Sequence, residues 1–263
     1  MTRDLTDLEA LDALAWQIEL GADEAMSEEP INRLEAPPEP KTTGKVEPAA
    51  ETPAETFKER SENGPDDAGA ARIAAACANL VQLQEALRAF DGCSLKKGAR
   101  NTVFCDGNPE ARVMIIGEAP SREEDQSGTP FVGRSGRLLD KMLAAIDLAR
   151  DAETPQKAVY ITNVMPWRPP QNRDPSPEEI LMMRAFLMRH IELKSPEFIV
   201  TMGNSATKTV LDVTTGIARM RGTWSDHTSI PVLPMFHPDA LLRDPSKKKE
   251  AWADLLSLKA RLL

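Results

Sequence analysis

Short apolar runs and amphipathic stretches alternate along the carboxyl-terminal part of the chain. The apolar runs are typical of buried strands, and the stretches between them have apolar residues at the three- and four-residue spacing of helices. We predict strands at 112–117, 158–163, 198–202 and 231–235, and helices at 134–148, 176–193, 204–213 and 247–262. Strands separated by helices favour right-handed crossovers and parallel pairing. The predicted fold class is therefore α/β, with three α/β/α layers and a central, mostly parallel four-stranded sheet.

The amino-terminal part follows a different pattern, which divides the chain into three predicted segments. Residues 1–26 hold an N-terminal amphipathic helix, in which leucines recur every three residues. Its apolar face either packs on the folded domain of the same chain or binds a protein partner. Residues 27–68 are rich in Pro and Glu, which predicts a disordered linker, because such a composition buries too little apolar surface to fold. Residues 69–263 form the folded domain, which opens with one continuous helix at 69–91.

Charge is distributed unevenly between these segments. The formal net charge of the 263 residues is −9. Residues 1–70 hold 18 acidic and 6 basic side chains, a net charge of −12, which leaves +3 for residues 71–263. The acidity of the whole chain is therefore weak evidence against a nucleic-acid partner, because the folded part is mildly basic.

Cysteine content and hydropathy indicate the compartment. Cys77, Cys93 and Cys105 are odd in number and belong to no paired motif, which predicts a reducing environment without disulfides. No apolar run has membrane-spanning length, and the acidic N-terminus is unlike a signal peptide. We expect a cytoplasmic, monomeric protein with no membrane partner.

Polar residues of the kinds that take part in catalysis and ligand binding follow every predicted strand. Glu118 and the acidic, glycine-rich loop 117–136 follow the first strand, Asn163 ends the second, Asn204 follows the third and His237 follows the fourth. Each has an ordinary structural explanation when taken alone, such as a turn or a cap. Because the carboxyl ends of parallel strands meet at one edge of a sheet, where ligands bind, we expect these residues to share a site. The glycine fingerprints of simple nucleotide-binding folds are missing from the sequence.

Taken together, these motifs resemble the uracil-DNA glycosylase superfamily, and most closely its family 4. The resemblance covers residues 88–260 and rests on GEAPSREEDQSGTPFVGRSG at 117–136, VYITNVMPWRPPQNRDP at 159–175, GNSA at 203–206, RGTW at 221–224 and FHPDALLR at 236–243. It implies a monofunctional DNA repair glycosylase of base excision repair, with uracil-containing DNA, single- or double-stranded, as partner. Such an enzyme flips uracil out of the stack and hydrolyses its N-glycosidic bond, leaving an abasic site.

The resemblance also assigns roles in catalysis and in recognition of the base. Glu118 would orient water and stabilise the cationic sugar, and His237 would donate to uracil O2 as negative charge develops there. Phe131 would stack on the flipped base. Asn163 would accept from N3–H and donate to O4, and Glu124 would shape the pocket near C5. Ala119 completes the predicted substrate-binding set.

A further set of residues matches positions that contact DNA. Leu241 and Leu242 would fill the vacated stack as a wedge, and Arg243 would lie near a phosphate. The whole predicted DNA-binding set is Arg134, Ser135, Arg173, Asn204, Ser205, Arg221, Leu241, Leu242 and Arg243.

The chain departs from the family 4 pattern at the iron–sulfur ligands. Family 4 enzymes generally bind a four-iron cluster through four cysteines, but the matching positions here are Phe90, Cys93, Trp167 and Met183. One thiol cannot hold such a cluster. We therefore predict no iron–sulfur cluster, no other cofactor and no metal site, with the bulky apolar residues filling the space that a cluster would occupy.

Other departures bear on the reaction. Ser121 stands where the family usually has glycine, which puts the loop backbone there in doubt. The loop 168–175 has no histidine, whereas the related branch that bonds covalently to DNA uses one in this loop, so we expect no covalent product. Two alternatives remain: a catalytically weak single-stranded DNA binding or damage-sensing protein on the same fold, and a nucleotide-binding α/β protein. The joint presence of the four predicted pocket residues favours the enzyme.

Overall fold

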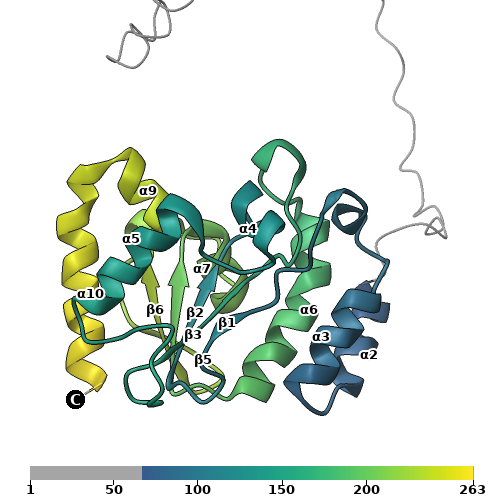
Figure 1. The fold of residues 1–263 in the computed structure, drawn as a ribbon, viewed down its shortest axis with the longest axis horizontal. Coiled ribbons are helices and arrows are strands. Elements are labelled where there is room, and N and C mark those ends of the chain that lie inside the picture. Colours follow the sequence, from purple (N-terminus) through teal and green to yellow (C-terminus); the bar gives the residue numbers. More distant parts are fainter. Residues whose placement is uncertain (1–66, 263) are drawn as a thin grey trace, which may run out of the picture. The chain divides into compact units, whose positions relative to one another are not determined.

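A computed structural model describes residues 67–262 of the chain (Figure 1). The predicted N-terminal helix at 1–26 and all but the last two residues of the predicted linker at 27–68 lie outside the described residues. None of the helices within 67–262 is both long and apolar enough to cross a membrane.

The centre of the described region is one sheet with strand order β1-β3-β2-β4-β6-β5. Its inner strands pair in parallel and are β3 (Val159–Asn163), β2 (Val113–Gly117), β4 (Phe198–Met202) and β6 (Ile230–Met235). These are the four predicted strands, and the predicted three-layer α/β class is confirmed. The predicted total of four strands is wrong, because β1 (Asp106–Gly107) and β5 (Ser225–His227) add short antiparallel pairings at the two edges. Both are too short to show an alternating pattern in the sequence.

Helices cover both faces of this sheet (Figure 1). One face carries α2 (Asp67–Ala76), α3 (Leu80–Ala89), α6 (Pro177–Lys194) and α7 (Asn204–Leu211). The other carries α5 (Gly133–Ala144), α9 (Pro238–Arg243) and α10 (Lys248–Leu262). Shorter elements in the connections are α4 (Arg122–Ser127), α8 (Ile217–Met220) and the 3₁₀ turns η1 (Ser94–Gly98), η2 (Pro170–Asn172) and η3 (Pro245–Lys247).

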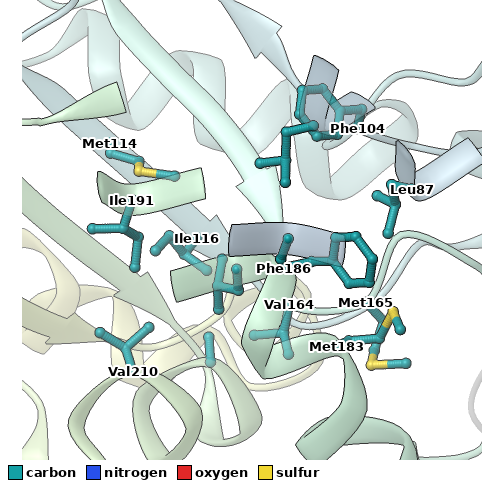
Figure 2. Packing of buried hydrophobic residues seen from close by; sticks show 14 of the residues in the cluster. Leu87, Phe104, Met114, Ile116, Val164, Met165, Met183, Phe186, Ile191 and Val210 are labelled. Carbon is teal, nitrogen blue, oxygen red and sulfur yellow. The ribbon is translucent and has the colours of Figure 1, made fainter. Parts of the chain in front are cut away.

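Strand β2 shows how one apolar run supplies two cores. Successive side chains of a strand point to opposite faces. Met114 and Ile116 join the buried cluster beneath α2, α3 and α6, part of which Figure 2 shows. Val113 and Ile115 join the cluster beneath α5 and α10. All four side chains are at most 1 % exposed, as expected for a parallel strand covered on both faces.

The predicted continuous helix at 69–91 is wrong, because α2 and α3 are separate helices. The side chain of Asn79 accepts a hydrogen bond from the backbone N–H of Gln82 at 2.9 Å, which makes Asn79 the N-cap of α3. Two guanidinium nitrogens of Arg189 donate to the carbonyl of Cys77 at 3.1 and 2.7 Å. This contact from α6 satisfies a backbone acceptor that the break exposes.

Two helix ends and one loop also differ from the prediction. Helix α5 stops at Ala144 rather than 148, and Asp147 in the following turn has φ +64°. Helix α7 stops at Leu211 rather than 213, with Asp212 in the left-handed region at φ +55°. Aspartate marks such an end less clearly in a sequence than glycine does, because it adopts the left-handed region less often. The long loop 117–136 contains α4 and is therefore partly helical.

The order of the inner strands creates a topological switch point. From β2 the chain moves to β3 on one side, and it then returns to β4 on the other side of β2. In open α/β sheets the ligand site lies beyond the carboxyl ends of the strands at such a point. The residues that follow β2 and β4 therefore mark the expected position of the site.

Candidate active site

Glu118 follows β2 directly, and its side chain extends from the end of β2 to the start of α7, which follows β4. Its Oε1 accepts a hydrogen bond from the backbone N–H of Ser205 at 2.7 Å, at the start of α7, where a helix terminus favours an anion. Gly203 has φ +99°, and a Cβ there would lie 2.6 Å from the carboxyl carbon of Glu118. Burial raises the pKa of Glu118, and the N–H groups of Ser205 and Asn204 oppose this rise. The carboxyl group is thus fixed in orientation and suited to holding a water molecule or taking its proton.

His237 follows β6 and is the N-cap of α9. Its Nδ1 accepts a hydrogen bond from the backbone N–H of Asp239 at 3.2 Å. Burial lowers the pKa of His237 to about 4, an effect that Asp239 opposes and Arg243 assists. The ring is therefore neutral at pH 7, and because Nδ1 is an acceptor its proton is on Nε2. His237 can act as a neutral hydrogen-bond donor through Nε2–H.

Phe131, Asn163 and Gly117 lie against one another beside these two residues, at a position that we call the slot. Phe131 is 2 % exposed and Asn163 is 7 % exposed. A Cβ on Gly117 would collide with both the Phe131 ring and Oδ1 of Asn163, so only glycine lets these two side chains keep their positions. The rings of Phe131 and His237 lie 5.2 Å apart at an interplanar angle of 27°.

The amide nitrogen of Asn163 is the unusual atom of this slot. Nδ2 is buried and has no hydrogen-bond partner among residues 67–262. Buried polar groups nearly always have a partner, because an unpaired one retains its full desolvation penalty. An amide left unpaired next to an aromatic ring points to a ligand that carries an acceptor and a flat face.

Glu124 lines the same region but is occupied by the backbone. Its Oε2 accepts from the N–H of Ser121 at 2.5 Å, and its Oε1 accepts from the N–H of Phe131. Ser121 in turn accepts from the N–H of Glu124, so the two form the capping box of α4. Ser121 thus caps α4 at the position where the family usually has glycine. Glu124 also has a role that the sequence did not indicate, which is to hold the peptide of Phe131.

A cleft of about 740 Å³ adjoins the slot, within the size range of ligand pockets. The predicted residues that line it are Glu118, Ala119, Glu124, Arg134, Ser135, Arg173, Asn204, Ser205, His237 and Arg243. Arg243 has a side chain that is 77 % exposed and forms an ion pair with Asp239 at 3.1 Å. Arg173 forms a two-pronged ion pair with Glu179, at 2.9 and 2.7 Å. The structure thus brings most of the predicted set to one cleft, which three arginines and five carboxylates line.

Arg221 is an exception, because it does not line the cleft and its guanidinium binds α10. Its Nε donates to Oδ2 of Asp254 at 2.9 Å, its Nη2 also binds Asp254, and Nη2 donates to the carbonyl of Glu250 at 2.9 Å. The Asp254 side chain is 1 % exposed. Arg221 therefore neutralises a buried carboxylate of α10 and is held away from the cleft.

Leu241 is the second exception. It is 1 % exposed and packs with Phe236 and Ala251 in a buried cluster between α9 and α10. The structure therefore gives Leu241 a packing role, and its predicted role as a wedge stays a prediction. Leu242 is half-buried and remains the candidate of the pair.

Comparison with known proteins places this geometry in a family. The family described as "Uracil DNA glycosylase superfamily" matches residues 104–256, more than half of the chain. The chain belongs to the uracil-DNA glycosylase superfamily. This result confirms the predicted family, and it covers every strand from β1 to β6 together with the whole cleft.

Curated relatives refine the position within the superfamily. The type-4 uracil-DNA glycosylase of Archaeoglobus fulgidus is 38 % identical over 172 residues, which are 62 % of this chain and 82 % of that protein. The type-4 uracil-DNA glycosylase of Saccharolobus solfataricus is 36 % identical over 193 residues, 70 % of this chain and 87 % of that protein. The type-5 uracil-DNA glycosylase of Pyrobaculum aerophilum is 30 % identical over 146 residues, 51 % of this chain and 64 % of that protein. The predicted affinity to family 4 is confirmed.

The positions that match the family's iron–sulfur ligands do not fit such a cluster in this chain. Phe90, Cys93, Trp167 and Met183 are 6 %, 1 %, 1 % and 1 % exposed and belong to one buried apolar cluster. Trp167 donates its indole N–H to Oγ1 of Thr102 at 3.1 Å, and burial raises the pKa of the Cys93 thiol, which disfavours the thiolate that iron requires. Within residues 67–262 no three acidic, histidine or cysteine side chains converge as a metal site would need.

Sequence reasoning missed Gly117, Gly203 and Arg150. The two glycines matter because a Cβ at either position would enter the site, and the available signals were their place at a strand end and in the motifs at 117–136 and 203–206. Arg150 lies outside every motif, yet it donates hydrogen bonds to the carbonyls of Pro130 and Phe131. No pattern in the sequence relates it to the slot.

Proposed function

We propose that the chain is a monofunctional uracil-DNA glycosylase that binds a flipped uracil in the slot and hydrolyses its N-glycosidic bond. The observation that carries the proposal is the buried, unpartnered Nδ2 of Asn163 beside the Phe131 ring. Uracil supplies what this slot lacks, namely an acceptor at O4 and a flat ring. Family membership independently supports a uracil-DNA glycosylase.

Asn163 explains the choice of base. Its Oδ1 accepts from uracil N3–H while its Nδ2 donates to O4. Cytosine presents an acceptor at N3 and a donor at C4, so both hydrogen bonds would be reversed. A buried site built for one pattern rejects the other strongly, because its polar groups would be left unpaired.

His237 stabilises the leaving group. Cleavage of the bond between C1′ of the sugar and N1 of uracil leaves the bonding electron pair on the base, and much of the negative charge appears on O2. The Nε2–H of neutral His237 donates to this oxygen as its charge develops. The pKa of about 4 makes the neutral ring the working form at pH 7, so His237 stabilises the anion without transferring its proton.

Glu118 acts on the sugar side of the same bond. The sugar becomes cationic as the base departs, and a carboxylate nearby stabilises that charge. The oxygen of a water molecule then bonds to C1′, and Glu118 orients this water and takes its proton. The hydrogen bond from the Ser205 N–H fixes the carboxyl group for this task. Among the residues that the structure describes, no lysine lines the cleft, so no Schiff base with the sugar and no strand cleavage are expected.

Access to the slot comes from the cleft. Arg134 and Arg243 are exposed at the cleft, and the start of α7 offers backbone N–H groups, so this surface suits the phosphates beside the flipped nucleotide. Because Phe131 and Asn163 are nearly buried, a base reaches them only as the slot widens. Binding energy from the phosphate contacts is available to drive this opening.

We further propose that this activity needs no iron–sulfur cluster, because Phe90, Trp167 and Met183 supply apolar packing at the matching positions. The protein partner of the N-terminal segment and the monomeric state remain predictions from the sequence.

An excision assay tests the proposed function. Labelled oligonucleotides with one uracil, single-stranded and paired with guanine or adenine, are incubated with the full chain and then treated with alkali. We expect strand breaks after alkali but none before it, and Asn163→Ala should lower the rate about a hundredfold or more, for the loss of roughly 3 kcal/mol of transition-state stabilisation. Tight binding without uracil release by the wild type would instead favour the damage-sensing alternative and overturn the proposal.

A further inference from the structure

Phe131 has a backbone conformation that needs support. Its φ is +51°, in the left-handed region that a residue with a bulky side chain rarely adopts. Such strain persists only where neighbouring groups over-determine it, and it tends to occur at functional sites. The contacts of the Phe131 peptide therefore show which groups keep the ring in the slot.

Two charged side chains hold the backbone of Phe131, one at its N–H group and one at its carbonyl group. Glu124 accepts from the N–H of Phe131, and Arg150 donates from Nη2 to the carbonyl of Phe131 at 2.9 Å. Nη1 of Arg150 also donates to the preceding carbonyl, of Pro130, at 3.2 Å. Gly136 lies directly against the Phe131 carbonyl, and a Cβ there would collide with it, so helix α5 closes the third side.

Arg150 is itself fixed by two carboxylates. Nη1 lies 2.8 Å from Oδ2 of Asp106 in β1, and Nε lies 2.8 Å from Oδ1 of Asp140 in α5. The Arg150 side chain is 18 % exposed. A planar guanidinium that binds two carboxylates and two carbonyls has few alternative orientations. Arg150 thus ties the edge of the sheet and α5 to the loop that carries Phe131.

We propose that Arg150 is a positioning residue for base recognition, which holds the Phe131 ring in the geometry that uracil requires. The inference rests on the proposed function. Arg150 does not line the cleft, so we place its action on Phe131 rather than on the substrate. Its loss should impair the step that needs a seated base and spare the binding of DNA that lacks one.

Single-turnover excision and DNA binding, measured on the full chain, separate these effects. Arg150→Gln should lower the excision rate of saturating enzyme on a uracil oligonucleotide about 10- to 100-fold, as expected for a displaced binding group. Its Kd for the same oligonucleotide carrying a tetrahydrofuran abasic analogue should stay within about twofold of wild type, because phosphate contacts dominate affinity for DNA. A wild-type excision rate would overturn the positioning role, and so would an equal loss of abasic-DNA binding.

Arg112 offers a matched control. It also pairs with a carboxylate, Glu197 at 2.8 Å, and with a backbone carbonyl, that of Leu262 at 3.2 Å, and its side chain is 27 % exposed. It lies at the opposite end of β2, away from the cleft. Arg112→Gln should leave the excision rate within about twofold of wild type, because distant surface pairs act independently. A rate loss matching that of Arg150→Gln would show that any broken ion pair slows the enzyme, and would overturn the inference.

A double-mutant cycle tests the route through Phe131. In a Phe131→Ala background, Arg150→Gln should lower the remaining rate less than about threefold, because residues that act as a unit are not additive. The full single-mutant loss recurring in that background would refute action through Phe131.

Should Arg150→Gln fail to fold, Arg150→Lys is the alternative variant, because it keeps the positive charge between the two aspartates but lacks the forked guanidinium group. A wild-type excision rate in Arg150→Lys would also overturn the inference, whereas no uracil release by the wild type would contradict the proposed function itself.

Discussion

Trp167 offers a quantitative test of how the chain does without the family's iron–sulfur ligands. The substitution Trp167→Ala removes an indole that is 1 % exposed and packed in the large cluster beneath α2, α3 and α6. Replacing a buried Trp by Ala typically destabilises a protein by about 3–5 kcal/mol, and the lost hydrogen bond to Thr102 adds about 1 kcal/mol. We expect the free energy of unfolding to fall by about 4–6 kcal/mol.

Urea denaturation followed by far-UV circular dichroism measures this change, with Trp252→Ala as the matched control. Trp252 lies on α10 and is 43 % exposed. Its removal should lower the free energy of unfolding by less than about 1 kcal/mol, as is usual for a surface substitution. Equal effects of the two substitutions would refute the reasoning, because Trp167 would then contribute no more than a surface residue. A fall in thermal midpoint of roughly 10–20 °C should accompany Trp167→Ala, since 1 kcal/mol corresponds to about 2–4 °C in a domain of this size.

Three further predictions concern the cofactor, the pH dependence and the slot. Protein purified without oxygen should be colourless and contain no stoichiometric iron, because Cys93 is the one thiol at the four matching positions; visible absorbance with about four irons per chain would contradict this. The excision rate should fall in acid as Glu118 is protonated, at a pH above the ordinary 4.5 because burial raises its pKa, whereas His237, with its pKa of about 4, should add no inflection near pH 6.5. An inflection near 6.5 that disappears in His237→Asn would show that the imidazole is charged in the working enzyme. Gly117→Ala should lower excision at least about a hundredfold, because the added methyl group enters the slot between Phe131 and Asn163 and displaces the ring; near wild-type excision by this variant would mean that uracil binds elsewhere.

The sequence predicted the inner strands and the polar residues at their ends, because both follow from local pattern. Glu118, Asn163 and His237 each come directly after an apolar run, and parallel strands bring such ends to one edge. The edge strands β1 and β5 escaped prediction because two or three residues carry no period. The break between α2 and α3 was missed because Asn79 reads as one polar residue in a helical pattern until its capping contact is seen.

Side chains whose roles depend on distant partners could not be assigned from the sequence. Arg221 looks like a DNA contact until Asp254, 33 residues later, is found against its guanidinium. Leu241 and Leu242 are equally apolar, and only the packing of α9 decides which one is buried. Arg150 reaches the peptide of Phe131 from 19 residues away, a contact that no spacing rule describes.

The most direct test of the account is base choice in Asn163→Asp. A protonated aspartic acid can donate its O–H to cytosine N3 and accept, at its carbonyl oxygen, from the cytosine amino group. This is the reverse of the pattern that Asn163 offers uracil. Excision is measured on matched oligonucleotides that carry one uracil or one cytosine, with wild-type protein and the variant side by side. The account predicts that the wild type releases uracil alone, and that Asn163→Asp loses at least about a hundredfold on uracil while gaining measurable release of cytosine. Undiminished uracil release by Asn163→Asp, with none of cytosine, would contradict the assignment of this slot as the uracil pocket.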